Sequence, residues 1–258
     1  MSVSVVIPAL NEEPTIARVV QACLADDPLE VLVIDADSSD ATAAVATAGG
    51  ARVINWREVL PHVPVRVGKG ESLWRGVEAA RGDIVVFVDA DLESAAPGLV
   101  SALAAPFADP SIHLVKPVYS RTFGNQPTGG GRVTELTAKP LLGMFFPDLS
   151  HIAQPLGGEY AIRRSVAHEL PFVDGYGVEA GLMIDVAHFF GADAIAQVKL
   201  PPRVHRNRPL SQLAPMAKVV AETILDRAHL YGTSAQATRS ALSQRPALEQ
   251  LESREIIS

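Results

Sequence analysis

The chain has 258 residues, 48% of them hydrophobic and 20% charged, which is enough apolar material for a globular core. Its net charge of −7 argues against a nucleic-acid-binding surface, and no apolar run reaches the ~18 residues that cross a bilayer. The single cysteine, Cys23, lies in an apolar helical pattern, so we expect a buried thiol. Because the chain starts almost at once with a strand, we expect a cytoplasmic protein that binds neither nucleic acid nor membrane.

Strands and helices alternate in the first part of the chain. The strands predicted here are residues 2–8, 29–34 and 51–54, and the helices between them begin after the N-cap Asn11 and near Thr42. The first helix carries Ile16, Val19, Val20 and Cys23 at the spacing of one buried face. This order predicts an α/β fold with a mainly parallel central sheet and helices on both faces.

A short buried strand, residues 84–88, leads directly into two acidic residues. Its five residues are all apolar, and Asp89-Ala90-Asp91 follows them. Residues two apart on an extended chain point the same way, and ligands bind at the carboxyl edge of a parallel sheet. Asp89 and Asp91 therefore predict a hard-oxygen site for Mg²⁺ or Mn²⁺ carrying a diphosphate. The alternative is a polar strand exit without a ligand, because the motif is short and common.

Three other polar turns are expected at the same edge. Residues 8–12 and 35–39 each follow a strand, while Gly68 and Lys69 open a helix. The glycines on both sides of Lys69 are expected to leave room for a ligand beside its ammonium group. Together the turns predict a nucleotide-diphospho-sugar pocket with Lys69 near the phosphates.

The sequence changes character at Tyr119. Residues 122–132 contain five glycines and prolines, which is typical of a functional or a disordered loop. Arg132 then opens a helix, and a planar guanidinium beside a glycine-rich turn suits a phosphate. Residues 175–179 are expected to open a helix that runs through Phe190, and apolar residues at the spacing of one helical face predict a long helix at residues 210–230.

Several of these motifs resemble known glycosyltransferases. Residues 8–13, 35–42 and 89–91 resemble the nucleotide-binding half of GT-A glycosyltransferases in general. A more specific set resembles the glucosyl-3-phosphoglycerate synthase family of retaining enzymes, and it consists of residues 68–71, 130–136, 155–161, 175–179 and 204–206. The likeness extends from residue 2 to about residue 231.

The resemblance implies a GT-A (Rossmann-like) fold with two halves. It implies a nucleotide-sugar-binding half at residues 1–118 and an acceptor-binding and catalytic half at residues 119–231. Residues 232–258 are rich in Ser, Gln, Arg, Ala and Glu, and we expect a flexible or oligomerising tail there.

For the donor, the resemblance implies contacts to each part of a UDP-sugar. The implied uridine-binding residues are Pro8, Ala9, Leu10 and Glu12, with Ser39 nearby. Lys69 is implied to lie near the uracil, in contrast to the phosphate position suggested by the residues alone. Asp89 would contact the ribose, and Tyr176 and Glu179 would contact the glucose. The less favoured alternative for Glu179 is a carboxylate that balances a helix dipole.

For the metal and the acceptor, the resemblance implies a second group of residues. Asp91 and His205 would bind Mg²⁺, or Mn²⁺, although a lone histidine is more often a surface or capping residue. Gly131, Arg132 and Thr134 would hold the phosphate of the acceptor, with Asn207 near its other end. The Leu156 carbonyl would face the anomeric carbon. The residues implied in catalysis are Asp91, Leu156, Glu179 and Arg132.

The activity implied is the metal-dependent transfer of glucose from UDP-glucose to the 2-hydroxyl of 3-phosphoglycerate, with retention. A homodimer is expected because similar enzymes are dimers. A GDP-sugar or mannose donor and a polyprenyl phosphate acceptor stay open. A nucleotidyltransferase would need a glycine-rich first βα turn, and residues 8–13 contain no glycine. A non-catalytic nucleotide-sugar-binding regulator is the remaining alternative.

Overall fold

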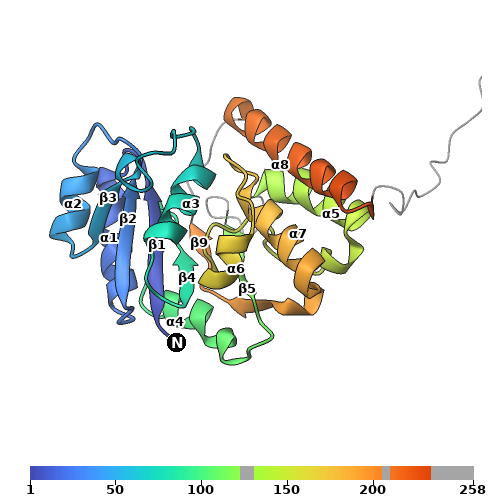
Figure 1. Cartoon of the computed structure of the whole chain (residues 1–258), viewed down its shortest axis with the longest axis horizontal. Coiled ribbons are helices and arrows are strands. Elements are labelled where there is room, and N and C mark those ends of the chain that lie inside the picture. Colours follow the sequence, from blue (N-terminus) through green and yellow to red (C-terminus); the bar gives the residue numbers. More distant parts are fainter. Residues whose placement is uncertain (123–130, 205–209, 234–258) are drawn as a thin grey trace, which may run out of the picture.

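A seven-stranded sheet with the order β3-β2-β1-β4-β7-β5-β8 forms the centre of the molecule (Figure 1). This computed structural model describes residues 1–122, 131–204 and 210–233. The strands of the sheet are β1 (Val3–Ala9), β2 (Glu30–Asp35), β3 (Arg52–Asn55), β4 (Ile84–Phe87), β5 (Leu114–Val118), β7 (Tyr160–Arg163) and β8 (Ile195–Lys199). Only β7 among them runs antiparallel to its neighbours β4 and β5, so the predicted mainly parallel sheet is confirmed.

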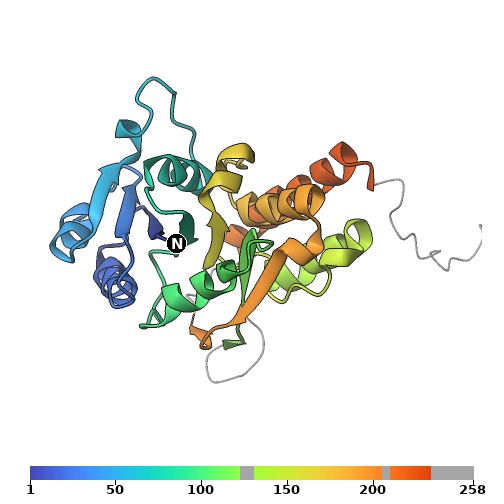
Figure 2. The same ribbon diagram turned by 60° about the horizontal axis from the view of Figure 1, so that its bottom comes forward.

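Helices cover both faces of this sheet. The longer ones are α1 (Glu13–Leu24), α2 (Thr42–Ala48), α3 (Lys69–Ala79), α4 (Leu99–Ala104), α5 (Lys139–Phe145), α6 (Arg164–Glu169), α7 (Val178–Phe190) and α8 (Leu210–Leu230). A π-helical turn, η3 (Thr134–Ala138), precedes α5, and short 3-10 turns are η1 (Trp56–Glu58), η2 (Ala105–Ala108), η4 (Pro147–Leu149) and η5 (Ala192–Ala194). In two views, the blue N-terminal elements and the orange-red C-terminal elements lie at opposite ends of the sheet (Figures 1 and 2).

Two hydrophobic cores, one on each face, follow from the alternation of side chains along the strands. In β4, Val85 and Phe87 pack in the core shared with α3, α7 and α8. Ile84 and Val86 point the other way, into the core shared with α1 and α4. All four side chains are 0–1% exposed, which explains why this strand is apolar at every position.

Pro8 lies inside β1, where the sequence placed the end of the strand. β1 pairs with β2 along one edge as far as Ala9. Along its other edge, β1 pairs with β4 only as far as Val6, which is opposite Phe87. Val6 faces β4, since its carbonyl accepts from the Val88 amide, and Pro8 faces the same side two residues later. Because β4 has ended there, the missing N–H of Pro8 removes no hydrogen bond from the sheet.

The sequence predicted Asn11 as the N-cap of the first helix, and this prediction is wrong, because Glu12 holds that position. Helix α1 begins at Glu13, and Asn11 has a left-handed backbone with φ 55°. Asparagine tolerates this conformation because its short side chain can hydrogen-bond locally. The Asn11 side chain instead accepts from the Ser39 amide at 2.8 Å and so connects the turn after β1 to the turn after β2.

Other features predicted from the sequence are confirmed. The first-helix stripe Ile16, Val19, Val20 and Cys23 is 0% exposed. Burial raises the pKa of the Cys23 thiol to about 12, so this cysteine is a packing residue rather than a nucleophile. Within the described ranges, no helix combines the length and apolar character needed to cross a membrane.

Candidate active site at the carboxyl edge of the sheet

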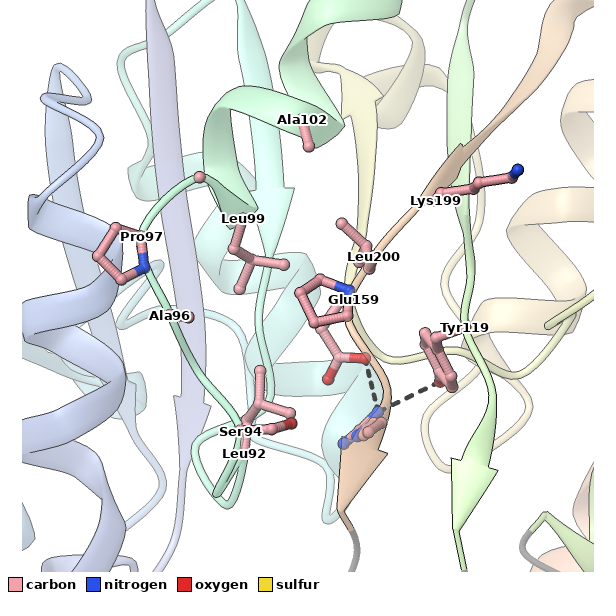
Figure 3. A pocket seen from close by; sticks show the side chains of 13 residues that line it. Leu92, Ser94, Ala96, Pro97, Leu99, Ala102, Tyr119, Glu159, Lys199 and Leu200 are labelled. Carbon is pink, nitrogen blue, oxygen red and sulfur yellow. Dashed lines mark hydrogen bonds and ion pairs between the residues drawn. The ribbon is translucent and has the colours of Figure 1, made fainter. Parts of the chain in front are cut away.

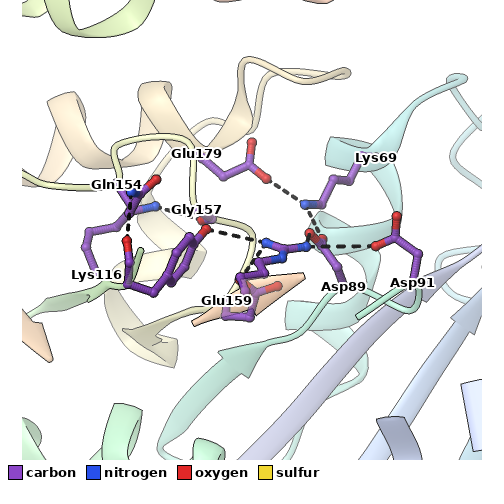
Figure 4. Close-up of polar contacts among 10 residues, drawn as sticks. Lys69, Asp89, Asp91, Lys116, Gln154, Gly157, Glu159 and Glu179 are labelled. Carbon is purple, nitrogen blue, oxygen red and sulfur yellow. Dashed lines mark hydrogen bonds and ion pairs between the residues drawn. The ribbon is translucent and has the colours of Figure 1, made fainter. Parts of the chain in front are cut away.

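The two carboxylates after β4 face one cationic group. Asp89 Oδ2 is 2.9 Å from an Arg203 guanidinium nitrogen, and Asp91 Oδ1 is 3.9 Å from the same nitrogen (Figure 4). Arg203 lies on β9 (Arg203–Val204), which pairs in parallel with β6 (Arg121–Thr122). Both carboxylates thus face the Arg203 guanidinium, although β4 ends at Phe87 and Asp91 lies in a turn rather than on the extended strand that the sequence predicted.

Lys69, the first residue of α3, connects two acidic residues from distant parts of the chain. Its ammonium nitrogen is 2.5 Å from Asp89 Oδ1 and 2.7 Å from Glu179 Oε1 (Figure 4). Burial opposes the charged lysine, but the two carboxylates outweigh it and raise the pKa of Lys69 well above its usual value. The same charge and that of Arg203 overcome the burial of Asp89 and hold its pKa well below the usual range.

The glycines that flank Lys69 make room for the chain itself. An added Cβ at Gly68 would lie 2.1 Å from the Asp174 carbonyl oxygen, and one at Gly70 would lie 1.8 Å from the Val173 carbonyl oxygen. Gly68 also has φ 144°, which side-chain-bearing residues rarely adopt. The expectation that these glycines leave space for a ligand is wrong. They allow the start of α3 to pack against residues 173–174, just before the segment that carries Tyr176 and Glu179.

Glu159 and Arg203 form a buried ion pair that the sequence did not predict. Their side chains are 2.6 Å apart, and the residues are 1% and 5% exposed. Burial raises the pKa of Glu159 to about 7, although the Arg203 guanidinium favours its ionised form. Glu159 lay in a motif quoted for the resemblance, but a contact 44 residues apart leaves no periodic signal in the sequence.

Both residues also line a cavity of about 230 Å³ (Figure 3). Tyr119, the residue after β5, lies beside the Arg203 guanidinium. The rest of the cavity is lined by residues between 92 and 98, by α4 and by residues 199–201. Arg203 is therefore fixed between this cavity and the carboxylates of Asp89 and Asp91.

The turns after β1 and β2 form a joined rim at the same edge. The Glu12 amide donates to Thr42 Oγ1 at 2.8 Å, and the Ser39 hydroxyl donates to the Asn11 side chain at 3.2 Å. Pro8 and Ala9 end β1, and Leu10 beyond them is 55% exposed. Leu10 and Ser39, both exposed, thus lie on turns that the hydrogen bonds hold together.

The residues expected around the sugar come from two segments. Glu179 lies in the first turn of α7 and is 4% exposed, and Tyr176 in the preceding turn is 40% exposed. We call Asp89, Asp91 and Glu179, with the Lys69 ammonium between Asp89 and Glu179, the acidic cluster. The loop that carries Leu156 approaches this cluster at Gly158, where an added Cβ would lie 2.1 Å from Asp89 Oδ2. The structure therefore brings the Leu156 loop, Asp89, Lys69 and Glu179 together.

The expected acceptor residues lie at the start of the helical segment that contains η3 and α5. Gly131 has φ 79°, and its carbonyl accepts from the Glu135 amide at 2.9 Å, which begins the helix as predicted. Arg132 is half-buried and Thr134 is 2% exposed. His205 and Asn207 lie outside the described residues. Within the described ranges, no three His, Cys, Asp or Glu side chains are grouped as in a complete metal site.

The chain matches known proteins over most of its length. The model of glycosyl transferase family 2 matches residues 4–170. Glucosyl-3-phosphoglycerate synthase of Mycolicibacterium paratuberculosis (strain ATCC BAA-968 / K-10) is 49% identical over 237 residues, which cover 88% of this chain and 72% of the relative. The protein of the same name from Petrotoga mobilis (strain DSM 10674 / SJ95) is 43% identical over 243 residues, which cover 90% and 75%.

Solved structures also match the chain over most of its length. Glucosyl-3-phosphoglycerate synthase from Mycobacterium tuberculosis, in complex with Mn²⁺, UDP-glucose and phosphoglyceric acid, matches with a TM-score of 0.82 and 48% identity, covering 88% of this chain and 80% of that chain. A structure of the same protein with Mg²⁺ and UDP has the same TM-score and covers 88% and 79%. The chain therefore belongs to glycosyl transferase family 2 and, within it, to the glucosyl-3-phosphoglycerate synthase family.

Proposed function

We propose that the chain transfers glucose from UDP-glucose to the 2-hydroxyl of 3-phosphoglycerate, with retention at the anomeric carbon. The observation that carries this proposal is the cluster of Lys69, Asp89, Asp91 and Glu179 beside the Leu156 loop. It lies in a chain about half identical to a synthase whose crystal structure holds UDP-glucose and phosphoglyceric acid.

The uridine would bind along the rim formed by the turns after β1 and β2. Pro8, Ala9, Leu10 and Glu12 would hold it, with Ser39 alongside. The Asn11–Ser39 and Glu12–Thr42 hydrogen bonds fix this rim before the nucleotide arrives, so little conformational entropy is lost on binding. Asp89 would contact the ribose, and Lys69 would bind near the uracil.

The residues at the end of β4 fit a divalent cation. The carboxylates of Asp89 and Asp91 already face one positive group, and hard oxygen ligands suit Mg²⁺ or Mn²⁺. Asp91 and His205 would hold the ion, which when bound stabilises the negative charge of the departing diphosphate as a Lewis acid. Arg203, held by Glu159, adds a fixed positive charge at the same edge.

The sugar would be oriented by Glu179, Tyr176 and the Leu156 carbonyl. The ion pair with Lys69 fixes the Glu179 carboxylate, which can accept hydrogen bonds from glucose hydroxyls. As the bond from the anomeric carbon to the diphosphate breaks, a bond to the acceptor oxygen forms on the same face. The acceptor proton passes to the leaving phosphate oxygen, and the Leu156 carbonyl dipole favours the positive charge that develops at the anomeric carbon.

The acceptor would bind at the start of the helical segment that contains η3 and α5. Gly131, Arg132 and Thr134 would hold its phosphate, with Asn207 near its other end. Amides at a helix start and a guanidinium both favour a phosphate. The division into a nucleotide-sugar-binding half (1–118), an acceptor-binding half (119–231) and a tail (232–258) is part of this proposal.

The first test is UDP release by the purified protein with Mg²⁺, measured for each donor with each acceptor. UDP-glucose with 3-phosphoglycerate is expected to be the preferred pair, and Arg132→Ala is expected to lower kcat/KM by about 100-fold or more. Arg18→Ala removes an exposed arginine of α1 and serves as the matched control. Preference for a polyprenyl phosphate, a GDP-sugar or a mannose donor would contradict the named substrates, and nucleotide-sugar binding without turnover would contradict catalysis.

We further propose a homodimer in which α8 and the end of α7 take part. Phe189, Leu225 and Leu230 are 59%, 45% and 63% exposed on these helices, and large apolar side chains that face solvent are typical of contact surfaces. Light scattering after size-exclusion chromatography should give twice the 27.4 kDa chain mass. A mass of one chain at micromolar concentration would contradict the dimer.

A further inference from the structure

A fully buried lysine lies behind the proposed sugar site. Lys116 on β5 is 0% exposed, and it faces the same side of the sheet as Leu114, which belongs to the core shared with α7 and α8. Burying an ammonium group is unfavourable unless its hydrogens find partners. A buried charge at a position where an apolar side chain would pack is therefore a reason to ask what Lys116 contacts.

Lys116 contacts the loop that carries Leu156. Its ammonium nitrogen donates to the Gly157 carbonyl oxygen at 3.0 Å and lies 4.5 Å from the centre of the Tyr160 ring (Figure 4). Within the described part of the chain, no carboxylate forms an ion pair with it. The ammonium group of Lys116 is thus stabilised by a hydrogen bond to a backbone carbonyl and by a cation–π contact with the Tyr160 ring.

Hydrogen bonds hold the peptide groups on both sides of Gly157. The Gly157 amide donates to the Gln154 carbonyl at 3.0 Å, and the Gly157 carbonyl accepts from Lys116. In a trans peptide the N–H and C=O groups point in opposite directions. The Leu156 carbonyl, which shares its peptide plane with the Gly157 amide, is therefore directed away from the Gln154 carbonyl.

The same loop is wedged between β5 and the acidic cluster. An added Cβ at Gly157 would lie 2.7 Å from Pro117 Cγ, and one at Gly158 would lie 2.1 Å from Asp89 Oδ2. The two glycines are needed for this approach, but glycine also has the most backbone freedom to lose. Lys116 is placed where it restricts that freedom.

We propose that Lys116 is a positioning residue for the glycosyl transfer, because its hydrogen bond to Gly157 fixes the Leu156 carbonyl relative to Asp89 and the donor sugar. This inference rests on the proposed function for the role of the Leu156 carbonyl. Among the residues that the structure describes, the hydrogen bond and the ring contact of Lys116 are to Gly157 and Tyr160 rather than to the nucleotide rim or to Arg132, so its loss should affect the chemical step more than UDP binding.

The test compares Lys116→Met with the wild type in three measurements. Methionine matches the length and apolar stem of lysine but removes the charge and the donor. We expect kcat to fall by about 100-fold or more, since small displacements of a reacting geometry have effects of that size. The Kd for UDP should stay within about threefold. The Tm should be unchanged or higher at pH 7, because the change removes a buried ammonium group that forms no ion pair with a described carboxylate, and burying such a charge is unfavourable.

A merely structural lysine would give a different pattern. A kcat within threefold of the wild type, or parallel losses in kcat, UDP affinity and Tm, would overturn the proposal. Lys218→Met, an exposed lysine of α8, is the matched control and should behave as the wild type. If Lys116→Met does not fold, Lys116→Arg decides, since it keeps the cation and the donor. At least a tenth of the wild-type kcat supports the proposal, and a lower value in a folded protein contradicts it.

Failure of the proposed function gives a separate result. It would appear as wild-type protein that does not turn over UDP-glucose with 3-phosphoglycerate. The hydrolysis of UDP-glucose by water, which needs no acceptor, then provides the same comparison of wild type and Lys116→Met. A 100-fold slower hydrolysis with unchanged UDP affinity supports the role of Lys116, and equal hydrolysis rates contradict it.

Discussion

At the scale of single residues, close backbone contacts decide the geometry of the site. Gly158 touches the Asp89 carboxylate, and Gly68 and Gly70 touch residues 173–174. The sequence showed the glycines and their motifs. It could not show which groups the glycines approach, because those groups are distant in the chain. A glycine leaves space that either a ligand or another segment of the backbone can fill.

Gly158→Ala should therefore inactivate the enzyme while leaving it folded. The new methyl group would lie 2.1 Å from Asp89 Oδ2, so the carboxylate or the Leu156 loop must move. We expect kcat/KM to fall by about 100-fold. Gly143→Ala is the control, since no atom lies within 4 Å of its added Cβ, and it should keep full activity. Wild-type activity in Gly158→Ala would show that this contact is not needed.

Lys116 should also make the stability of the protein depend on pH. Burial lowers the pKa of Lys116 from 10.5 to about 8 and the charge of Lys69 adds to this effect, although Glu179, Glu159 and Asp89 act in the opposite direction. Between these values the unfolded chain binds a proton that the folded chain does not, so stability rises with pH. From pH 8 to pH 9.5 the wild type should gain roughly 2 kcal/mol relative to Lys116→Met in urea unfolding. A difference that is constant with pH would contradict the lowered pKa.

At the scale of elements, the sequence predicted the mainly parallel sheet but not the direction of every strand in it. Helix α8 has the bounds that apolar periodicity predicted, and α7 begins within the segment expected to open it and ends at Phe190 as expected. The direction of β7 was not predicted, because a buried strand has the same apolar pattern whether it runs parallel or antiparallel. The Glu159–Arg203 ion pair was not predicted either, because each charged residue taken alone resembles a surface residue.

The contact between α7 and α8 depends on one buried ionic group. Arg227 Nε lies 2.7 Å from Asp185 Oδ1, and the Tyr231 hydroxyl donates to the same oxygen at 2.7 Å. Asp185→Ala leaves the arginine without its partner and should lower the free energy of unfolding by roughly 3–5 kcal/mol. Glu222→Ala breaks only the exposed pair with Lys218 and should cost less than about 1 kcal/mol. Equal effects of the two changes would contradict this role.

At the scale of the whole molecule, one sheet connects the parts that the sequence divides at residue 118. β5 lies before this boundary, and its neighbours β7 and β8 lie after it. The acidic cluster draws Lys69, Asp89 and Glu179 from both parts. The strand-edge argument predicted that Lys69 and Asp89 meet, because parallel strands end together, whereas Glu179 on helix α7 was expected there only from the resemblance.

The most direct test of the account is the structure of the product, determined by NMR after incubation with UDP-glucose, 3-phosphoglycerate and Mg²⁺. UDP-glucose carries an α-linked glucose, so retention predicts a single product with α-glucose on the 2-oxygen of 3-phosphoglycerate. A β-linked product would contradict the front-side mechanism. Glucose at another position, or on another acceptor only, would contradict the proposed transfer itself.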